Sequence, residues 1–312
     1  MYNLLLYKYK YPAFRSRGDV SMKLHQLFQP RQASGRVPSH RYIEIPPSEL
    51  LRPFVSTYWA SEPLSAPEQE MNTDNGAVDR VLPDGCTDIL FEQDLKDHRC
   101  QIRYIGLFDH PFAIAYDEQH PTRKFGVRFF PGGAYPFVRT PLSEFANQQL
   151  SLDALWPRLA EGISERLFEA SSLDARIQVI ESYLTTLLHR SKAVEDSRMA
   201  NLLERIFATK GTAGIEALAQ AEIISARQMN RMFEKWIGIT PKKFSEIVRF
   251  QSVISQLELS REPVDWSMLA LNHGFFDQAH LIHDFRRFYG DSPITAAREY
   301  GKMSDFYNPI RT

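Results

Sequence analysis

The side chains best suited to specific chemistry lie between residues 225 and 243, where guanidinium, amide and ammonium groups recur at helical spacing. The polar side of the helix expected there carries Arg227, Gln228, Asn230, Arg231 and Lys235, and the apolar side carries Met229, Met232, Phe233 and Trp236. Arginine pairs with guanine edges, and asparagine or glutamine with adenine edges, so the polar side suits readout of a DNA major groove. Lys242 and Lys243 open the next expected helix and are better placed to contact phosphates.

A second set of polar side chains lies between residues 277 and 287. Its outward-facing candidates are Gln278, His280, His283, Arg286 and Arg287, and its core candidates are Ala279, Leu281, Ile282, Phe285 and Phe288. His280 and His283 could also bind a metal ion, but the sequence offers no third ligand for them. We therefore expect no metal and no cofactor, and we interpret both histidines as DNA-facing or surface residues.

The two sets belong to an internal repeat. Residues 233–241 and 285–293 both fit the pattern F-x4-G-x2-P, and Ser225 and Asp277, which favour a helix N-cap, match at the same offset of 52 residues. The repeat unit has about the size of a helix-turn-helix. A helix of about 19 residues joins the copies and spans roughly 28 Å, compared with about 34 Å for one DNA turn. A rigid bridge of that length can set two recognition helices into successive major-groove segments.

Seven helices are expected to position these side chains, as judged from apolar periodicity, N-cap residues, Gly and Pro. The first includes residues 202–207 and ends near Gly211, and the next three span 215–221, 225–237 and 241–259. The last three begin near Asp265, at Asp277 and at Pro293, and the seventh ends before Gly301.

From Ser197 to Tyr300 the chain resembles the AraC/XylS-type transcription factors. The residues that carry the resemblance are Leu218-Ala219, Ser225, Gln228-Met229, Arg231, Phe233, Gly238, Pro241, Arg249-Phe250, Gly274-Phe275-Phe276-Asp277-Gln278-Ala279-His280, Phe285, Gly290 and Pro293. The resemblance implies a seven-helix domain with two helix-turn-helix motifs, which binds double-stranded DNA and works with RNA polymerase. It implies base contacts by Arg227, Asn230, Arg231, Gln278, Ile282 and His283. We expect phosphate contacts by Ser225, Lys235, Lys242, Lys243, Arg286 and Arg287.

The chain departs from the family pattern in both copies. Family members often have a small or apolar residue followed by Gly in the first turn, where this chain has Glu222 and Ile223. A residue other than Gly must then accept a left-handed conformation. Arg is common where His283 stands, and Phe where Leu281 stands. We therefore expect the first copy to dominate base readout and the second to anchor the register.

The front half is punctuated by Pro and Gly turns at intervals typical of short β-strands. Strands are expected at 42–45, 54–59, 78–82, 87–92, 101–105, 112–116 and 124–130, which favours a sandwich or barrel. Helical turns are expected at 134–139, 142–145 and 151–159, followed by a helix at 173–189. Its apolar stripe, from Ile177 to Leu188, is expected to pack between domains or to form a dimer interface. The motifs Tyr58-Trp59 and Leu82-Pro83-Asp84-Gly85 resemble a mainly β N-terminal domain found ahead of some such regulators.

Five residues of the front half are candidates for a small-molecule effector site: Trp59, Asp84, Cys86, Asp88 and Arg128. The segment 84–88 forms either an effector or thiol-sensing site or, more simply, a turn followed by a strand with alternating exposure. Arg128 either points into a β cavity and binds an anionic effector or faces water. No metal-ligand cluster and no nucleophile with a partnered base can be assembled there, so we expect no enzyme activity.

The length of 312 residues favours two domains, the low cysteine content indicates a reducing, cytoplasmic setting, and the expected strands and helices give an α+β fold. The net charge of −1 gives no overall attraction to nucleic acid or membranes, two cysteines cannot form a disulfide framework, and no apolar run reaches the length of a membrane span. The expected parts are an extension (1–40), a β-rich sensor or dimerisation domain (41–150), a helical linker region (151–196), the DNA-binding domain (197–300) and a tail (301–312). Translation could start at Met1 or Met22.

Two other functions are compatible with these features. The repeat could be a helical adaptor whose exposed face binds a protein partner instead of DNA. The front half could also be the catalytic barrel of an enzyme, although its histidines and acids suggest no catalytic group.

Overall fold

The computed structural model describes residues 24–32, 40–64, 79–114, 117, 119–190, 197–259 and 264–303. The N-terminal stretch 1–21, most of the loop expected at 61–77, and the segment 191–196 of the expected linker region lie outside these residues. Within the described ranges, every helix is too short or too polar to cross a membrane.

Antiparallel strands form the centre of the N-terminal half. Six strands pair in the order β1-β2-β7-β4-β5-β8, and β3 pairs with β6 in a separate two-stranded ribbon. The strands are β1 (His40–Ile45), β2 (Val55–Pro63), β3 (Asp79–Val81), β4 (Thr87–Asp94), β5 (Cys100–Ile105), β6 (Phe112–Ile114), β7 (Thr122–Phe129) and β8 (Gln149–Ser151). The seven expected strands are confirmed with small shifts at their ends, and β8 was not expected.

Helices cover one face of the six-stranded sheet. They are α2 (Tyr135–Val138), α3 (Leu152–Leu155), α4 (Pro157–Glu169) and α5 (Leu173–Arg190), and the 3-10 helix η2 (Leu142–Phe145) precedes β8. Residues of these helices form one apolar core with Tyr58, Ile89, Phe91, Phe125 and Val127 of the sheet. Within the described residues the strands form one open six-stranded sheet and a separate ribbon, so the expected sandwich or closed barrel is wrong. The stripe on α5 is used in this core, through Ile180 and Leu184, and does not pack between domains.

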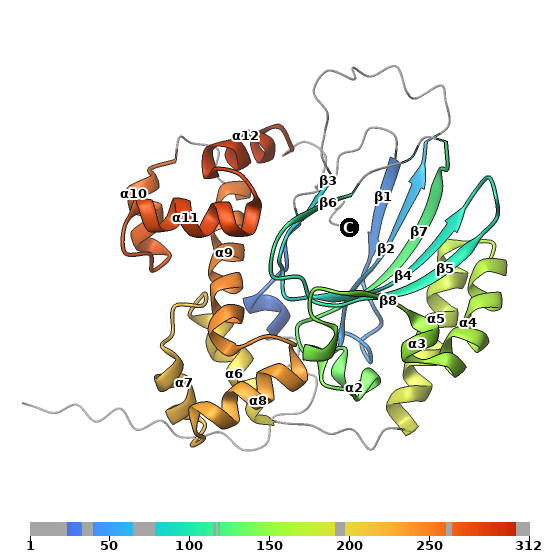
Figure 1. Cartoon of the computed structure of the whole chain (residues 1–312), viewed down its shortest axis with the longest axis horizontal. Helices are drawn as coiled ribbons and strands as arrows, with labels where there is room; N and C mark the ends of the chain where they lie inside the picture. The colour runs from blue at the N-terminus through green and yellow to red at the C-terminus, as the bar shows by residue number, and fades with distance from the viewer. Residues whose placement is uncertain are drawn as a thin grey trace, which may run out of the picture.

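The C-terminal half consists of helices, as expected. They are α6 (Ser197–Ala208), α7 (Ile215–Ala221), α8 (Ala226–Trp236), α9 (Pro241–Leu259), α10 (Trp266–Asn272), α11 (Gln278–Tyr289) and α12 (Pro293–Met303). The long helix α9 joins two groups, α6 to α8 at one end and α10 to α12 at the other (Figure 1). The α+β class, with a β-sheet half followed by a helical half, is confirmed, and α12 extends beyond its expected end.

The two halves share an apolar core. Leu82, Leu107 and Phe130 of the N-terminal half belong to the same buried cluster as the helices from α6 to α12. Residues 24–32 also join this cluster, because the Phe28 ring stacks on Phe207 of α6 with centroids 4.4 Å apart. The sequence had placed these residues in an extension, but Leu24 and Phe28 are buried in the cluster that the two halves share.

Candidate DNA-binding surface

The first helix-turn-helix consists of α7 and α8. Ser225 caps α8 in a reciprocal arrangement, in which its Oγ accepts from the Gln228 N–H at 3.2 Å and its own N–H donates to Gln228 Oε1 at 2.9 Å. Met229, Phe233 and Trp236 of α8 are buried, whereas Arg227, Asn230, Arg231 and Lys235 are exposed. The helix therefore presents its guanidinium and amide groups to solvent, as the sequence indicated.

The turn before α8 has a strained residue. Ile223 has a φ of 55° and its side chain is 93% exposed. The matching position in the second copy is Gly274, with a φ of 70°. Both turns thus use the left-handed conformation, and only the second uses the residue that adopts it without steric cost. The expectation that a residue other than Gly adopts the left-handed conformation in the first turn is confirmed at Ile223.

The second helix-turn-helix consists of α10 and α11. Asp277 caps α11 by accepting from the His280 N–H at 2.7 Å, and Gly290 ends the helix in the left-handed conformation. Gln278 and His283 are exposed and Ile282 is half-buried. Ala279 was expected in the core but is exposed, because it lies on the outer side of the first turn of α11.

The six phosphate-contact candidates differ in how they are engaged. Lys242 and Arg286 are exposed. The Oγ of Ser225 is used in the helix cap, and Arg287 pairs with Glu246 at 2.8 Å. The other two are in contact with the N-terminal half: Lys243 forms an ion pair with Asp109, and the Lys235 ammonium lies 5.1 Å from the centroid of the Tyr135 ring.

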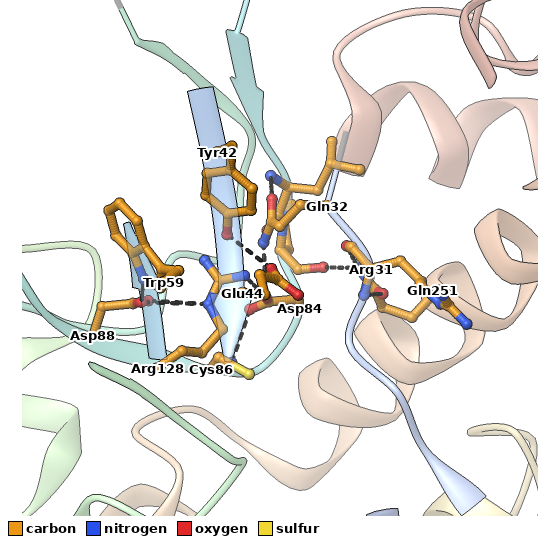
Figure 2. A network of polar contacts seen from close by, with 12 residues as sticks. Arg31, Gln32, Tyr42, Glu44, Trp59, Asp84, Cys86, Asp88, Arg128 and Gln251 are labelled. Atoms are coloured by element: carbon orange, nitrogen blue, oxygen red, sulfur yellow. Dashed lines mark hydrogen bonds and ion pairs between the residues drawn. The ribbon is translucent and has the colours of Figure 1, made fainter. Parts of the chain in front are cut away.

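Four of the five effector-site candidates form one polar cluster on the other face of the sheet (Figure 2). Asp88 accepts from Trp59 Nε1 at 2.9 Å and from Arg128 Nε at 3.3 Å, and Arg128 NH1 lies 3.5 Å from Asp84. Cys86 joins through its N–H, which donates to Asp84 at 2.9 Å. Asp84, Cys86 and Asp88 are all buried. The predicted alternation of exposed and buried residues in the segment 84–88 is therefore wrong. Arg128 is already paired with two carboxylates, so it neither faces water nor offers a free cation.

Burial sets the ionisation of this cluster. It raises the pKa of Asp88, against the opposing effect of Arg128 and the hydrogen bond from Trp59. It also raises the pKa of the Cys86 thiol, an effect that Asp84 adds to. A thiol with a raised pKa is a poor nucleophile, which disfavours the thiol-sensing interpretation of Cys86. For Arg128, burial lowers the pKa but Asp88 and Asp84 outweigh it, so the guanidinium stays charged.

The cluster is connected to α9 through the segment 24–32. The Gln32 amide donates to Asp84 at 2.7 Å. The preceding residue, Arg31, donates its backbone N–H to the Gln251 side chain on α9 at 2.7 Å, and its carbonyl accepts from the same side chain at 3.0 Å (Figure 2). Gln251 also donates to the Pro83 carbonyl at 2.8 Å. Sequence reasoning missed Arg31, Gln32 and Gln251, because neither their types nor their spacing indicates contacts between segments 52 and 220 residues apart.

One group of side chains within the described ranges has metal-ligand character. Ligand atoms of Asp94, Asp97 and His120 lie within 4.8 Å of one another. Asp94 caps the N–H groups of Lys96 and Asp97, and Arg99 lies 2.6 Å from Asp97. The acidic charge is thus neutralised by neighbouring protein groups, and we assign no metal to it.

The C-terminal half is a double helix-turn-helix domain in its elements, its caps and its exposed polar faces. Comparison with known families agrees, since residues 218–299 match a family described as a helix-turn-helix domain. The AraC/XylS resemblance is confirmed for this domain. Residues 43–151 match a domain of unknown function (DUF6597).

Two curated relatives have regulatory names. An uncharacterized HTH-type transcriptional regulator of Haemophilus influenzae is 31% identical over 102 residues, which are 32% of this chain and 34% of that protein. The HTH-type transcriptional regulator MtrA of Neisseria gonorrhoeae is 27% identical over 112 residues, 36% of each protein. The match therefore spans about a third of the length of each relative.

Solved structures of ToxT from Vibrio cholerae are distant neighbours. One covers 69% of this chain and 88% of ToxT at a TM-score of 0.35 and 11% identity. Another, of ToxT bound to an unsaturated fatty acid, covers 70% of this chain and 88% of ToxT, with a TM-score of 0.35 and 9% identity. Similarity at this level supports no inference about the present chain.

Proposed function

We propose that this chain is a sequence-specific DNA-binding transcription regulator whose two recognition helices enter successive major-groove segments. The observation that carries the proposal is the exposed polar face of α8, with Arg227, Asn230 and Arg231 next to a fully capped N-terminus. In α11, Gln278 and His283 occupy comparable exposed positions. Guanidinium and amide groups at the start of a recognition helix are the groups that read base edges.

The bridge helix supports the proposed spacing of the two readers. α9 has 19 residues, so it spans about 28 Å at 1.5 Å per residue. Successive major-groove segments on one side of B-DNA are separated by about 34 Å. Because each reader packs on α9 through its buried side, the bridge sets their separation without a second subunit. The proposed DNA-binding unit is therefore residues 197–300.

Phosphate contacts would come from Lys235, Lys242, Lys243, Arg286 and Arg287. In the proposed complex, Ser225 at the N-terminus of α8 also faces the DNA backbone. The net charge of −1 for the whole chain means that affinity depends on these local cations and not on the overall field. Each phosphate contact releases condensed counterions, so binding falls steeply with salt.

The N-terminal half supports a proposal of effector control. Trp59, Asp84, Asp88 and Arg128, with Cys86 beside them, form a buried polar cluster that the DNA-binding surface does not use. Since Arg128 is already neutralised, an anionic effector must compete with Asp84 and Asp88 for it. Further parts of the proposal are RNA polymerase as a partner, which rests on the family resemblance, a cytoplasmic location, which rests on the low cysteine content, and a homodimer.

The test is DNA binding by Arg231→Ala. It should lose more affinity for a selected specific duplex than for random DNA, by a factor of about 10 to 100, because a paired contact to one base discriminates by about 1–3 kcal/mol. Arg298→Ala is the matched control, because Arg298 is an exposed arginine on α12, outside both recognition helices. Equal losses of affinity for the specific and the random duplex would show that Arg231 does not read a base.

The alternative function is a protein-interaction adaptor that uses the same exposed faces. A shift assay on genomic fragments across a salt series separates the two, because an adaptor retains no duplex at any salt concentration. An enzymatic role for the front half finds no support in the buried cluster, whose charges are paired with one another.

A further inference from the structure

The N-terminal half contacts two cations at the junction of α8 and α9, Lys235 near the end of α8 and Lys243 near the start of α9. Asp109, in the loop before β6, forms its ion pair with Lys243, one of the lysines at the N-terminus of α9. The loop is braced for this contact, because the Asp109 N–H donates to Asn147 Oδ1 at 3.0 Å and the Asn147 N–H donates to the Leu107 carbonyl at 2.8 Å. The Asp109 side chain is only 14% exposed, so its carboxylate is directed at Lys243 and away from solvent.

The second contact lies at the end of the recognition helix α8. The Tyr135 ring of α2 packs on Trp236 with centroids 4.6 Å apart, and its face receives the Lys235 ammonium. Beside it, a Cβ added to Gly238 would lie 3.0 Å from the Leu142 carbonyl oxygen of η2. The N-terminal half therefore contacts the end of α8 and the start of α9 closely, where the phosphate-contact candidates Lys235 and Lys243 lie.

We infer that the Asp109–Lys243 contact, with the Tyr135–Lys235 contact beside it, is an autoinhibitory latch that holds the first helix-turn-helix in a state of low DNA affinity. The inference rests on the proposed function. The Asp109 carboxylate takes the place at Lys243 that a DNA phosphate would take, and a phosphate brought to the same position meets a charge of its own sign. DNA and the N-terminal half therefore compete for Lys243, and any event that withdraws the loop before β6 raises affinity.

The latch makes a specific prediction for salt dependence. A lysine already paired with a protein carboxylate gains little from meeting a phosphate and adds little to counterion release. When the carboxylate is neutralised, Lys243 becomes available for one further phosphate. The slope of log K against log salt should then steepen by about 0.9 for that single contact.

The experiment compares Asp109→Asn with wild type on a duplex that wild type selects from a random pool. The expected result is a rise in affinity of about three- to tenfold, with the steeper slope. The matched control is Asp97→Asn, which changes the net charge equally at an exposed carboxylate paired with Arg99 in the β4–β5 connection. This control should leave the slope unchanged.

A second variant separates the latch from a general charge effect. In a Lys243→Gln background, Asp109→Asn should no longer change affinity or slope, because the cation that it releases is absent. Equal effects of Asp109→Asn and Asp97→Asn, or an Asp109→Asn effect that persists without Lys243, overturn the latch while DNA binding stands. A wild-type chain that retains no duplex overturns the proposed function and the latch together.

Discussion

Arg249 on α9 donates a hydrogen bond to the carboxylate of Asp284 on α11 at 2.8 Å, and both side chains are largely buried. The same guanidinium lies over the Phe275 ring, 4.4 Å from its centroid, in the turn before α11. The bridge helix is thus joined to both the second recognition helix and its preceding turn. Arg249 therefore helps to orient α11 on α9, beside the Arg287–Glu246 ion pair and the contacts of Phe250 with Phe285 and Phe288.

Removing Arg249 should destabilise the C-terminal half. Arg249→Met leaves the Asp284 carboxylate buried without its cation, which costs about 3–5 kcal/mol. The double variant Arg249→Met with Asp284→Leu should recover part of this loss, because no buried charge is left. Urea unfolding of the single and double variants measures the coupling, and strictly additive losses would contradict a direct interaction between the two side chains.

Replacing Ile223 by Gly should stabilise the first turn. A β-branched residue in the left-handed region costs about 1–2 kcal/mol, and the extra chain entropy of Gly offsets only part of that gain. We expect a net increase of about 1 kcal/mol in the free energy of unfolding. The opposite change, Gly274→Ala, should destabilise the second turn for two reasons. Residue 274 has a positive φ, and the added Cβ would lie 2.6 Å from Thr212 Cγ2. A loss of stability in Ile223→Gly would show that the Ile223 side chain makes a compensating contact.

Stability should fall with pH below 6.5 because of His273. Burial, together with the charge of Lys210, lowers the pKa of this histidine from 6.5 to about 4. Its Nδ1 lies 2.7 Å from Ser252 Oγ, which itself donates to the Arg249 carbonyl, so neutral His273 is the donor to Ser252. The unfolded chain therefore binds a proton more readily than the folded one, and stability present above pH 6.5 is lost between pH 6.5 and 4.

The His273 contribution amounts to on the order of 3 kcal/mol across that window. His273→Asn keeps a donor near Ser252 but does not titrate, so its free energy of unfolding should depend less on pH than that of wild type. Chemical denaturation of both chains from pH 7.5 to 4 checks this. Parallel curves would assign the acid sensitivity to other groups.

A side chain at Gly126 should disrupt the buried cluster. The Trp59 ring lies directly on Gly126, and an added Cβ would come within 2.0 Å of a ring carbon. Gly126→Ala must therefore displace the indole and break its hydrogen bond to Asp88. Destabilisation by about 1–3 kcal/mol is expected, with altered tryptophan fluorescence. Unchanged emission and stability would mean that Trp59 is not held there.

Local signals in the sequence predicted the C-terminal helices closely. The limits of α7 and α9 follow from apolar periodicity and from Pro241, and Ser225 and Asp277 act as the N-caps their types indicate. By contrast, most of α4 was missed, because the helical turns expected at 151–159 stop at residue 159, whereas Pro157 occupies the first position of a helix that continues to Glu169. Proline is compatible with isolated helical turns and with the first position of a longer helix, and only packing against the sheet decides between the two.

The contacts between the halves could not be predicted. Asp109 and Lys243 are ordinary surface residue types, and their pairing depends on how the sheet docks against α8 and α9. The same holds for Arg128, since the sequence could not reveal that Asp84 and Asp88 converge on it. The fold of the helical C-terminal half is therefore encoded locally, whereas the sites that link it to the N-terminal half depend on the tertiary structure.

Selection of bound duplexes from a random pool would show whether α8 and α11 read DNA together. Two readers joined by α9 should enrich sites with two short conserved blocks whose centres lie about 10 base pairs apart. The block contacted by α8 should lose its conservation in Arg231→Ala, while the other block remains. Enrichment of a single block, or of none, would contradict the account of two recognition helices acting through one rigid bridge.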